Sequence, residues 1–555
     1  MKRLKVAFLL DGPTISPHVY NLIDLLGNDQ NFKKPIVIYC SNSVGSNLGG
    51  IRQLRFLLQK TKYLISRLFH KLIQKVDAII FPNQVAVDHD LSLHLLDELE
   101  EISIDAQGLK PNSCLRLTKI QLQELKSKQI DIIIQRKNFF LTDDLFEISR
   151  LGILSLHFSG ISSHNYNAGG LWEVLHNIPS TQFTITHDTP FKNTTLILGS
   201  TMTTHSWCSN NSNLIAKLTV FLKNIFDQAV IDDYLIAVPS NSKINNQLPT
   251  NFHTFTFLKY IFYTISIGLS NKILSAIYGS QVSRWSIAYA NHKNFTKSLS
   301  EYVEIKNPDR RFLADPFLFK SNGQTIIFAE DYFYSDRKGR ISAIDISNDE
   351  PEFLGVVLEE DFHLSFPFIF ENDGSIYMIP ETHQANEIRL YECSRFPLEW
   401  TFKMTLLENV SSADTMIFKH ANSWFLLTNI CSANINEHQS ELHIFWSDTL
   451  LTNDWKPLKI GNPIIFDSQK ARNGGFLISN NQLYRINQFH EKNHYGKGFG
   501  VNLIKTLSKN SFEEIRVKDI NPIFKKDIDS THHFNAVGDM AVTDYCRTVS
   551  LKSIK

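Results

Sequence analysis

The chain lacks an excess of charge of either sign. Its 555 residues carry 56 Lys and Arg against 56 Asp and Glu, so the formal net charge is zero and the pI is about 7.3. A protein that holds nucleic acid by its phosphates needs a basic surface or domain. This balance argues against a dedicated nucleic-acid binder, and we expect no nucleic-acid partner.

Cysteine is also scarce. The six cysteines are scattered along the chain, and no two of them form a Cys-x-x-Cys pair. That pattern argues against a disulfide framework and against a structural zinc site. We therefore predict no metal site, and we expect the protein in the reducing cytoplasm.

Long apolar runs are missing too. The first strand-like segment ends at Asp11 after a few apolar residues, too short for a signal peptide. A second segment, residues 255–269, is rich in Phe, Tyr and Ile but contains Lys259 and falls short of the roughly 20 residues that span a bilayer. It predicts a packed helix between domains.

A basic segment at 51–75 holds seven Lys and Arg and no acid, with leucines at helical spacing. A basic amphipathic helix of this kind can lie on an anionic membrane surface. The alternative is a domain helix with one solvated face. We predict possible peripheral contact with the inner face of the membrane through 51–75.

Strand and helix signals alternate over residues 1–235. The strand candidates are 5–10, 35–40, 78–81, 131–135 and 153–157, and the helix candidates are 18–27, 51–75, 118–128 and 142–150. Short apolar runs separated by helices predict a doubly wound α/β domain with a parallel sheet. An Asn- and Ser-rich linker and a helical connector follow, over 236–283.

A short motif recurs about every 50 residues in the remaining part, 284–555. Its copies are ADPFLF at 314–319, SFPFIF at 365–370, ADTMIF at 413–418 and RNGGFL at 472–477. A polar turn and a second apolar run follow the first three copies. Strand–turn–strand units with this period are typical of propeller blades, and the length predicts an all-β five-bladed β-propeller. The alternative is an irregular sandwich.

Carboxylates recur at matching positions of these units. Asp315 and Asp414 occupy the same position of the motif in the first and third units, and Glu330 and Glu381 end the second apolar run of the first two. Glycosyl chemistry needs carboxyl groups around an anomeric carbon. We predict Asp315, Asp414 and Glu381 as catalytic; the alternative for each Asp is a turn residue that caps backbone amides.

Further polar residues of the same half are candidates for binding. Arginine and histidine can hold a phosphate or carboxylate of a donor or acceptor. The predicted substrate-binding residues are Arg472, Arg485, His532, His533, Glu330 and Gln488.

A third set of candidates follows the predicted strand at 153–157. A strand that ends on His157 is followed by a polar loop, by Gly169-Gly170 and by a strand pair. This segment resembles formyltransferases that use a formyl-tetrahydrofolate donor, across residues 150–200. The resemblance assigns His157 to the family's histidine, but Ser155 stands where the family has Asn, and Asn193 where it has the catalytic Asp.

An Asn cannot take up and return a proton as an Asp does. His164, His187 and Asp188 lie nearby in the sequence and could compensate. We predict an N-terminal cleft formed by His157, Ser155, Asn193, His164 and Asp188.

The β-rich half is similar to the N-terminal domain of plant glucosamine inositolphosphorylceramide transferases. It also looks distantly like the propellers of family 32 and 43 glycoside hydrolases. The motifs that carry the resemblance are 311–317, 377–381, 413–415, 472–475, 484–488 and 531–535. The hydrolases imply a general base or nucleophile at Asp315.

These observations lead to three hypotheses. The first is a transferase of surface-polysaccharide or glycolipid biosynthesis, in which the propeller holds the sugar and the α/β domain binds a donor or serves as support. The second is a formyltransferase that acts on an amino sugar. The third is a non-catalytic glycan-binding scaffold. The donor, a nucleotide-sugar or formyl-tetrahydrofolate, stays open.

Overall fold

A computed structural model describes most of the chain. The described residues are 3–10, 14–15, 17–41, 71–81, 91–92, 99–105, 114–115, 117–135, 140–141, 143–158, 169–235, 237, 254–291 and 301–554. The chain divides into two compact units. The first comprises Met1–Ala237 and Lys243–Leu269, and the second comprises Val238–Ser242 and Ser270–Lys555.

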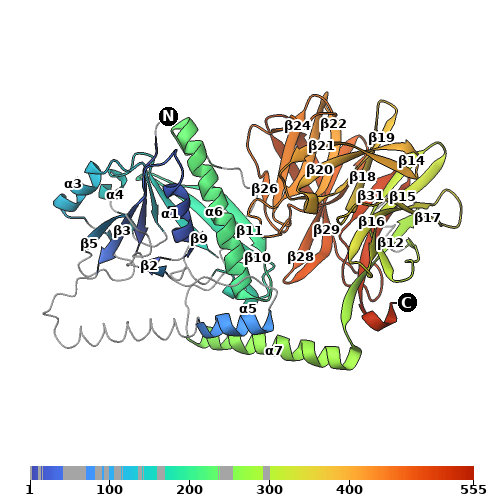
Figure 1. Cartoon of the computed structure of the whole chain (residues 1–555), viewed down its shortest axis with the longest axis horizontal. Coiled ribbons are helices and arrows are strands. Elements are labelled where there is room, and N and C mark those ends of the chain that lie inside the picture. Colours follow the sequence, from blue (N-terminus) through green and yellow to red (C-terminus); the bar gives the residue numbers. More distant parts are fainter. Residues whose placement is uncertain are drawn as a thin grey trace. The chain divides into compact units, whose positions relative to one another are not determined.

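The N-terminal unit is built on a seven-stranded sheet in the order β11-β10-β9-β7-β1-β3-β5 (Figure 1). Five strands are parallel: β1 (Val6–Leu10), β3 (Ile36–Ser41), β5 (Glu100–Asp105), β7 (Ile132–Gln135) and β9 (Ile153–Phe158). Two more, β10 (Ser180–Asp188) and β11 (Asn193–Met202), are antiparallel. Two short pairs lie outside this sheet, β2 (Thr14–Ile15) with β4 (Leu91–Ser92) and β6 (Cys114–Leu115) with β8 (Phe140–Leu141).

Continuous runs of Val, Ile and Leu explain the central strands, because parallel strands are buried on both faces. The helices are α1 (Pro17–Gly27), α3 (Lys119–Ser127), α4 (Asp143–Phe146), α5 (Leu171–Leu175), α6 (Trp207–Asp232) and α7 (Thr254–Tyr278). Leu125 of α3 and Leu145 of α4 share one core with sheet residues such as Ile133. The long helix α6 contacts α1, β10 and β11.

One predicted strand is wrong. Residues 71–80 are helical, so 78–81 belongs largely to a helix instead of a strand. A short apolar run has the same composition in a strand and in a buried helix turn, and periodicity alone does not separate the two.

Of the basic segment 51–75, residues 71–75 are helical and 51–70 lie outside the described residues. Strand β5 was not predicted, because its sequence EEISID carries few apolar residues.

A buried carboxylate joins three helical segments of the N-terminal unit. Asp77 accepts hydrogen bonds from Ser206 Oγ at 2.8 Å, from the Cys208 backbone N–H at 3.1 Å and from Tyr260 Oη at 2.8 Å. It thereby satisfies a free N–H at the start of α6, where a negative charge is favourable. Residues 71–80, α6 and the first half of α7 are held together at this point.

The C-terminal unit consists of antiparallel sheets (Figure 1). Three are formed by β14 (Arg311–Ser321) to β17 (Glu352–Leu358), by β18 (Ser365–Asn372) to β21 (Glu399–Glu408), and by β22 (Ser412–His420) to β25 (Lys456–Pro457) with β26 (Ile465–Phe466). The strands between these are β15 (Gln324–Phe333), β16 (Lys338–Asp345), β19 (Ser375–Glu381), β20 (Glu387–Arg395), β23 (Ser423–Ile430) and β24 (Glu441–Ser447). Short 3-10 turns lie at His383–Ala385 and Leu551–Ser553.

An eight-stranded sheet completes the unit. One half comprises β27 (Asn473–Ser479), β28 (Gln482–Glu491), β29 (His494–Leu507) and β30 (Phe512–Ile520). The other half comprises β31 (Phe534–Val537), β32 (Met540–Ser550), β12 (Gln281–Ala290) and β13 (Val303–Glu304). A single parallel pair, Leu477 with Ala536, joins the halves.

The first strands of these five four-stranded groups contact one another in a cycle. β14 contacts β18, β18 contacts β22, β22 contacts β27, β27 contacts β31, and β31 contacts β14. None of the sheets formed by the described strands closes on itself. In the last group β12, which precedes all the others in sequence, pairs with β32 from Gln281–Ser550 to Ala290–Ala541.

Candidate functional site

The recurring motif forms a β-bulge. In β14 the pairing with β15 shifts register between Ala314 and Phe317, and β18, β22 and β27 shift at the equivalent point. The residue inside the bulge has a left-handed backbone in three copies, with φ of 48° at Asp315, 46° at Phe366 and 48° at Asp414. Asp adopts this conformation more readily than most residues, and a bulge redirects the side chain.

A fifth copy of the bulge precedes β31. Ser530 pairs with Cys546 and Phe534 pairs with Thr543, so the segment before β31 has one residue more than the facing part of β32. Each of the other copies also has one extra residue relative to its partner strand. Thr-His-His-Phe at 531–534 is therefore equivalent to Ala-Asp-Pro-Phe at 314–317. His532 occupies in this unit the position that Asp315 occupies in the first.

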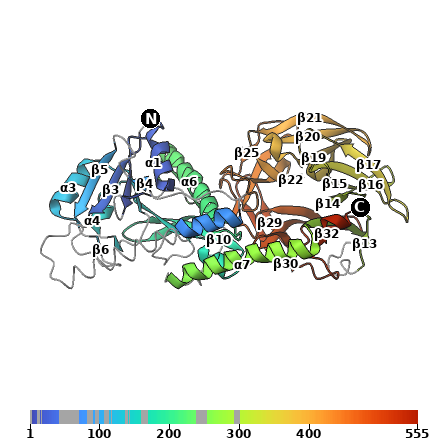
Figure 2. The same ribbon diagram turned by 60° about the horizontal axis from the view of Figure 1, so that its bottom comes forward.

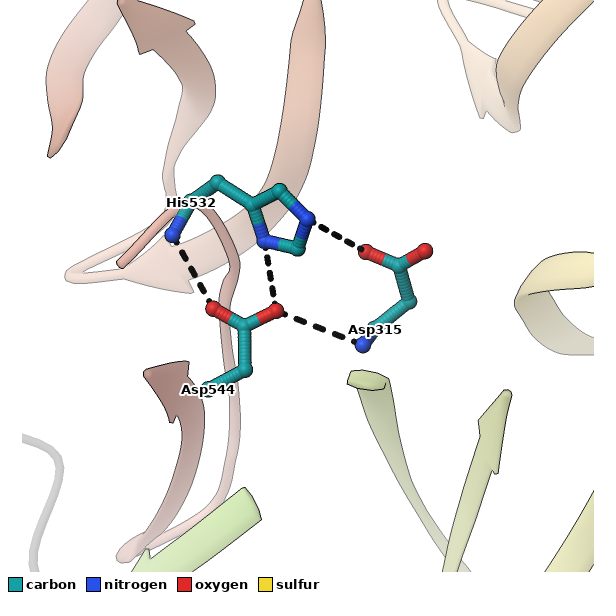
Figure 3. Close-up of side chains that lie close together, drawn as sticks. All are labelled: Asp315, His532 and Asp544. Atoms are coloured by element: carbon teal, nitrogen blue, oxygen red, sulfur yellow. Dashed lines mark hydrogen bonds and ion pairs between the residues drawn. The ribbon is translucent and has the colours of Figure 1, made fainter. Parts of the chain in front are cut away.

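Asp315, His532 and Asp544 lie together in the interior (Figure 3). Asp544 accepts the backbone N–H of His532 and of His533 at 3.0 Å each, and its Oδ2 lies 2.5 Å from His532 Nδ1. The imidazole then faces Asp315, with 3.7 Å between His532 Nε2 and Asp315 Oδ1. The indole of Trp285 stacks on the imidazole at 4.0 Å between ring centroids. The ring is thus fixed by a carboxylate on one nitrogen and an aromatic face.

Charges set the protonation of these three groups. Burial lowers the pKa of His532, but the carboxylates of Asp544 and Asp315 outweigh it and raise that pKa above its ordinary value. Burial raises the pKa of Asp315 to about 6, with His532 opposing and Asp544 and Glu381 adding to the rise. Asp315 Oδ1 is buried and accepts no hydrogen bond.

The same three residues offer ligand atoms to a cation. One ligand atom from each lies within 4.8 Å of the others. Among the described residues, this is the group of His, Cys, Asp and Glu side chains close enough together to hold a metal ion. Two carboxylates and an imidazole suit a divalent ion.

Asp414 is held in an ion pair. Arg472 donates from Nε to Asp414 Oδ2 at 2.5 Å and from Nη2 to Oδ1 at 3.1 Å, and Gln488 Nε2 donates to Oδ2 at 2.9 Å. Arg472 Nη2 also reaches Glu381 Oε2 at 3.3 Å. Despite burial, Asp414 and Glu381 hold the pKa of Arg472 well above its usual range. Asp414 therefore positions Arg472, and burial raises the pKa of Asp414 well above its ordinary value although the charge of Arg472 opposes the rise.

Glu381 and Glu330 differ in protonation. Burial raises the pKa of Glu381, but the hydrogen bond from His383 at 2.9 Å and the charge of Arg472 bring it well below its usual range. Burial, together with the charges of Asp315 and Glu381, raises the pKa of Glu330 well above its ordinary value. The pKa values of Glu381 and Glu330 are therefore shifted in opposite directions, which favours the carboxylate form of Glu381 and the protonated form of Glu330.

Three of these neighbours were not found from the sequence. Asp544 lies in β32, opposite the fifth bulge. The sequence would have indicated Asp544 as a candidate only if that bulge had been recognised. His363 accepts the Gly339 N–H on Nδ1 at 2.9 Å and places Nε2 3.4 Å from Glu330 Oε1. His383 follows Glu381 by two residues. His363 comes from the loop between two sheets and His383 from the 3-10 turn between β19 and β20, and no periodicity in the sequence marks them.

Two predicted binding residues are used for structure. Arg485 is fully buried, donates to Glu514 at 2.7 and 2.6 Å, and gives its other N–H groups to the carbonyls of Lys470 and Ala471 and to Asn473 Oδ1. It has no donor left for a phosphate.

His533 packs its ring against Phe317 and Phe366, at 4.5 and 5.4 Å between centroids. Burial lowers the pKa of His533 to about 3, so the ring carries no charge at neutral pH. The structure therefore brings Asp315, Asp414, Glu381, Glu330, Arg472, Gln488 and His532 into one buried polar cluster, called the central cluster below, and places Arg485 and the His533 ring in supporting positions.

The N-terminal candidates form a separate row of polar side chains on β7, β9 and β10. Asp188 accepts hydrogen bonds from Ser155 Oγ, from Thr186 Oγ1 at 3.0 Å and from Gln135 Nε2 at 3.4 Å. His157 Nε2 lies 3.2 Å from Thr186 Oγ1, so one hydroxyl links the imidazole to the carboxylate. Burial lowers the pKa of His157.

Asn193 is not part of this row. It pairs with Asp188 at the turn end of the β10–β11 hairpin, and Asp188 pairs with Ile153, the first residue of β9. His157 lies four residues further along β9 and pairs with Thr184. His157 does sit near the carboxyl end of a central strand, as predicted, but Asn193 lies at the other end, and His164 lies outside the described residues.

The difference between Glu330 and Glu381 predicts different costs of amidation. Because burial favours the protonated form of Glu330, Glu330→Gln should change the free energy of unfolding at pH 7 by less than about 1 kcal/mol. Glu381→Gln removes a negative charge beside Arg472 and His383 and should cost about 2–3 kcal/mol. Urea unfolding of both variants at pH 7 measures the contrast. Equal costs would mean that Glu330 is ionised as well.

Comparison with known families covers the second half of the chain. Residues 280–536 match the family described as "Glucosamine inositolphosphorylceramide transferase 1, N-terminal". The rice (Oryza sativa subsp. japonica) protein named glucosamine inositolphosphorylceramide transferase 1 is 34% identical over 212 residues, which are 37% of this chain and 28% of that protein. The Arabidopsis thaliana protein of the same name is 34% identical over 211 residues, 37% and 27% respectively. The chain thus spans little more than a quarter of these relatives.

Among solved structures, the chain has low-scoring matches to glycoside hydrolases. The catalytic domain of a family 62 α-L-arabinofuranosidase from Coprinopsis cinerea is 9% identical, with 47% of this chain and 96% of that one covered and a TM-score of 0.33. A family 117 glycoside hydrolase from Zobellia galactanivorans is 10% identical, with 49% and 93% covered and a TM-score of 0.32.

Proposed function

We propose that the protein is a transferase of glycolipid or surface-polysaccharide biosynthesis, and that the central cluster binds the sugar on which it acts. One observation carries the proposal. Asp315 and Glu330 are buried in the same cluster, where the pKa of Asp315 is raised to about 6 and that of Glu330 well above its ordinary value. We propose that Glu330 holds its proton at neutral pH while Asp315 is largely ionised. Carboxyl groups of opposite protonation are what proton transfer around a glycosidic centre requires.

The arrangement of strands supports a propeller as the scaffold. We infer that the five four-stranded groups are the blades of a five-bladed propeller, because their first strands contact in a cycle and because β12 and β32 close the last group from the two ends of the unit. The bulge positions of all five blades then converge on one axis. An irregular sandwich would give neither a cycle of first strands nor this equivalence.

Each residue of the cluster has a role in this proposal. Asp315 accepts the proton of the attacking hydroxyl as its oxygen bonds to the anomeric carbon, and Glu330 gives its proton to the departing oxygen, which leaves with the electrons of the broken bond. His532, protonated and held by Asp544, keeps Asp315 ionised. Arg472 and Glu381 orient the sugar or its phosphate.

The similarity to glucosamine inositolphosphorylceramide transferases agrees with glycosyl transfer to a phosphorylated lipid. In this proposal the donor is a nucleotide-sugar, and the α/β unit binds it or serves as support. Formyl transfer to an amino sugar is the second candidate. The row from His157 through Thr186 to Asp188 favours it, since it supplies the carboxylate that Asn193 does not. A cytoplasmic location at the inner face of the membrane is also part of the proposal.

A transfer assay with two labels separates the candidates. The purified full chain is incubated with a membrane lipid extract and, in parallel, with radiolabelled nucleotide-sugars or with labelled formyl-tetrahydrofolate and an amino sugar. We expect label from a nucleotide-sugar in the extracted lipid or polysaccharide. Label transferred from the folate would establish formyl transfer instead, and glycan binding without any transfer would leave the scaffold hypothesis.

A further inference from the structure

Helix α7 has an apolar face on each of two sides. On one side Tyr260 and Thr264 are buried, and Phe257 and Ile261 pack with Trp207 at the start of α6. The other side is exposed. The last turns, residues 270–278, are exposed on every side, and Leu274 and Tyr278 are exposed there as well. Along the exposed side of the whole helix the large apolar residues are Phe255, Leu258, Phe262, Ile265, Leu269, Ile273 and Ile277, with Phe262 77% exposed. We call these seven the α7 stripe.

Such a stripe needs an explanation. Single exposed apolar residues are normal, but a contiguous row of seven along one helix marks a surface that meets something apolar. The stripe runs about 33 Å along α7, at a rise of roughly 1.5 Å per residue. No described helix is long and apolar enough to cross a membrane, so contact with lipid would take place with the helix lying along the surface.

On the two described helices that form this surface, α7 and residues 71–80, the exposed charged side chains are lysines. The two charged residues of α7 are Lys259 and Lys272, both exposed. Helical residues 71–80 lie beside the first part of α7 (Figures 1 and 2), with Ile80 directly against Gly268. That neighbouring helix exposes Leu72 and Ile79 together with Lys71 and Lys75.

We propose that the α7 stripe docks the protein on a bilayer that contains anionic lipid. The apolar side chains enter the boundary between headgroups and acyl chains, and the lysines contact the phosphates. The docking element is thus α7 together with residues 71–80. This inference stands apart from the sugar chemistry of the central cluster, since a soluble enzyme with the same cluster would need no such stripe.

The spacing favours a flat surface over a second copy of the chain. A coiled-coil seam that begins at 255, 258, 262, 265 and 269 would continue at 272 and 276, where the sequence has Lys272 and Ala276. The exposed apolar residues continue at 273 and 277 instead, with 274 and 278 exposed beside them. This spacing follows the 3.6-residue period of a straight helix. The stripe therefore stays on one side of the helix and can lie along a flat surface.

Vesicle co-sedimentation of the full chain tests the proposal. Wild type should partition onto vesicles of 70% phosphatidylcholine and 30% phosphatidylserine, more weakly onto pure phosphatidylcholine, and more weakly again at 0.5 M salt. Phe255→Ser with Phe262→Ser should lower the partition coefficient at least about tenfold. Lys259→Glu with Lys272→Glu should lower it by a similar factor on the anionic vesicles only.

Phe191→Ser is the matched control. Phe191 is 96% exposed in the turn between β10 and β11, away from the stripe, and its loss should leave the partition coefficient unchanged. The exposed positions of all variants predict unaltered melting temperatures, which checks folding. The proposal is overturned if the Phe255 and Phe262 double variant binds vesicles as tightly as wild type. It is also overturned if sedimentation equilibrium shows a dimer that this variant dissociates.

Discussion

Asp315→Asn should lower turnover by on the order of a hundredfold or more and, at the same time, raise the melting temperature at pH 7. The first effect follows from the loss of the group that accepts the proton. The second follows from burial, which raises the pKa of Asp315 to about 6. The folded state then holds this proton more tightly than the unfolded chain does.

The sign of the pH dependence is fixed by that shift. A carboxyl group whose pKa is higher in the folded protein stabilises the fold at low pH, and this contribution is lost as the pH rises from its ordinary value of 3.8 to about 6. Asn carries no charge at any of these pH values. The melting temperatures of wild type and Asp315→Asn should therefore converge near pH 4 and separate above pH 6.

Backbone strain does not confound this variant, because Asn tolerates the left-handed conformation at φ 48° as well as Asp does. Glycan level in a complemented deletion strain gives the first measure of activity, and scanning calorimetry gives the stability. Glu350→Lys, an exposed charge reversal, serves as the control and should change neither. Wild-type glycan levels with Asp315→Asn would eliminate its catalytic role and favour the scaffold hypothesis.

Asp414→Asn should instead destabilise the fold, by about 3–5 kcal/mol. The equivalence of the two motif positions predicted similar behaviour for Asp315 and Asp414, but the structure separates them. Asp414 neutralises the buried guanidinium of Arg472 through two hydrogen bonds, and its loss leaves Arg472 with only the longer contact to Glu381. An uncompensated buried charge is the dominant cost.

A double-mutant cycle with Arg472→Met measures this coupling by urea unfolding. The double variant should be more stable than the sum of the single losses predicts, since neither charge of the pair is then left alone. The control is the exposed pair of Lys403 and Glu392 at 2.8 Å, where Glu392→Gln should cost less than about 1 kcal/mol. An Asp414→Asn cost as small as that of Glu392→Gln would contradict the ion-pair argument.

The motif spacing was enough to place Asp315 and Asp414 in equivalent bulges, because a repeated local sequence forms a repeated local structure. It was not enough to assign their roles. These depend on partners far away in sequence, such as Arg472 for Asp414 and Asp544 for the histidine that faces Asp315. The fifth copy escaped notice because Thr-His-His-Phe at 531–534 shares only its last residue with the first.

In the N-terminal unit, too, local structure was predictable from the sequence and long-range arrangement was not. The strands rich in Val and Ile were predicted from composition, whereas 78–81 was assigned to a strand although Asp77 and its neighbours continue a helix. Alignment by motif put Asn193 beside His157, but the antiparallel hairpin of β10 and β11 carries Asn193 to the opposite end of β9. Sheet register is a three-dimensional property that a linear motif does not encode.

The pairing of β12 with β32 has a consequence for synthesis of the protein. About 250 residues separate the two strands, so at 5–20 residues per second a ribosome needs roughly 10 to 50 s to deliver the partner of β12. During that time one edge of β12 is open to other strands. Asp315 likewise lies more than 200 residues before His532 and Asp544 in the sequence. A nascent chain that has not yet reached β32 therefore offers chaperones and proteases an unpaired edge, and its Asp315 still lacks both of these neighbours.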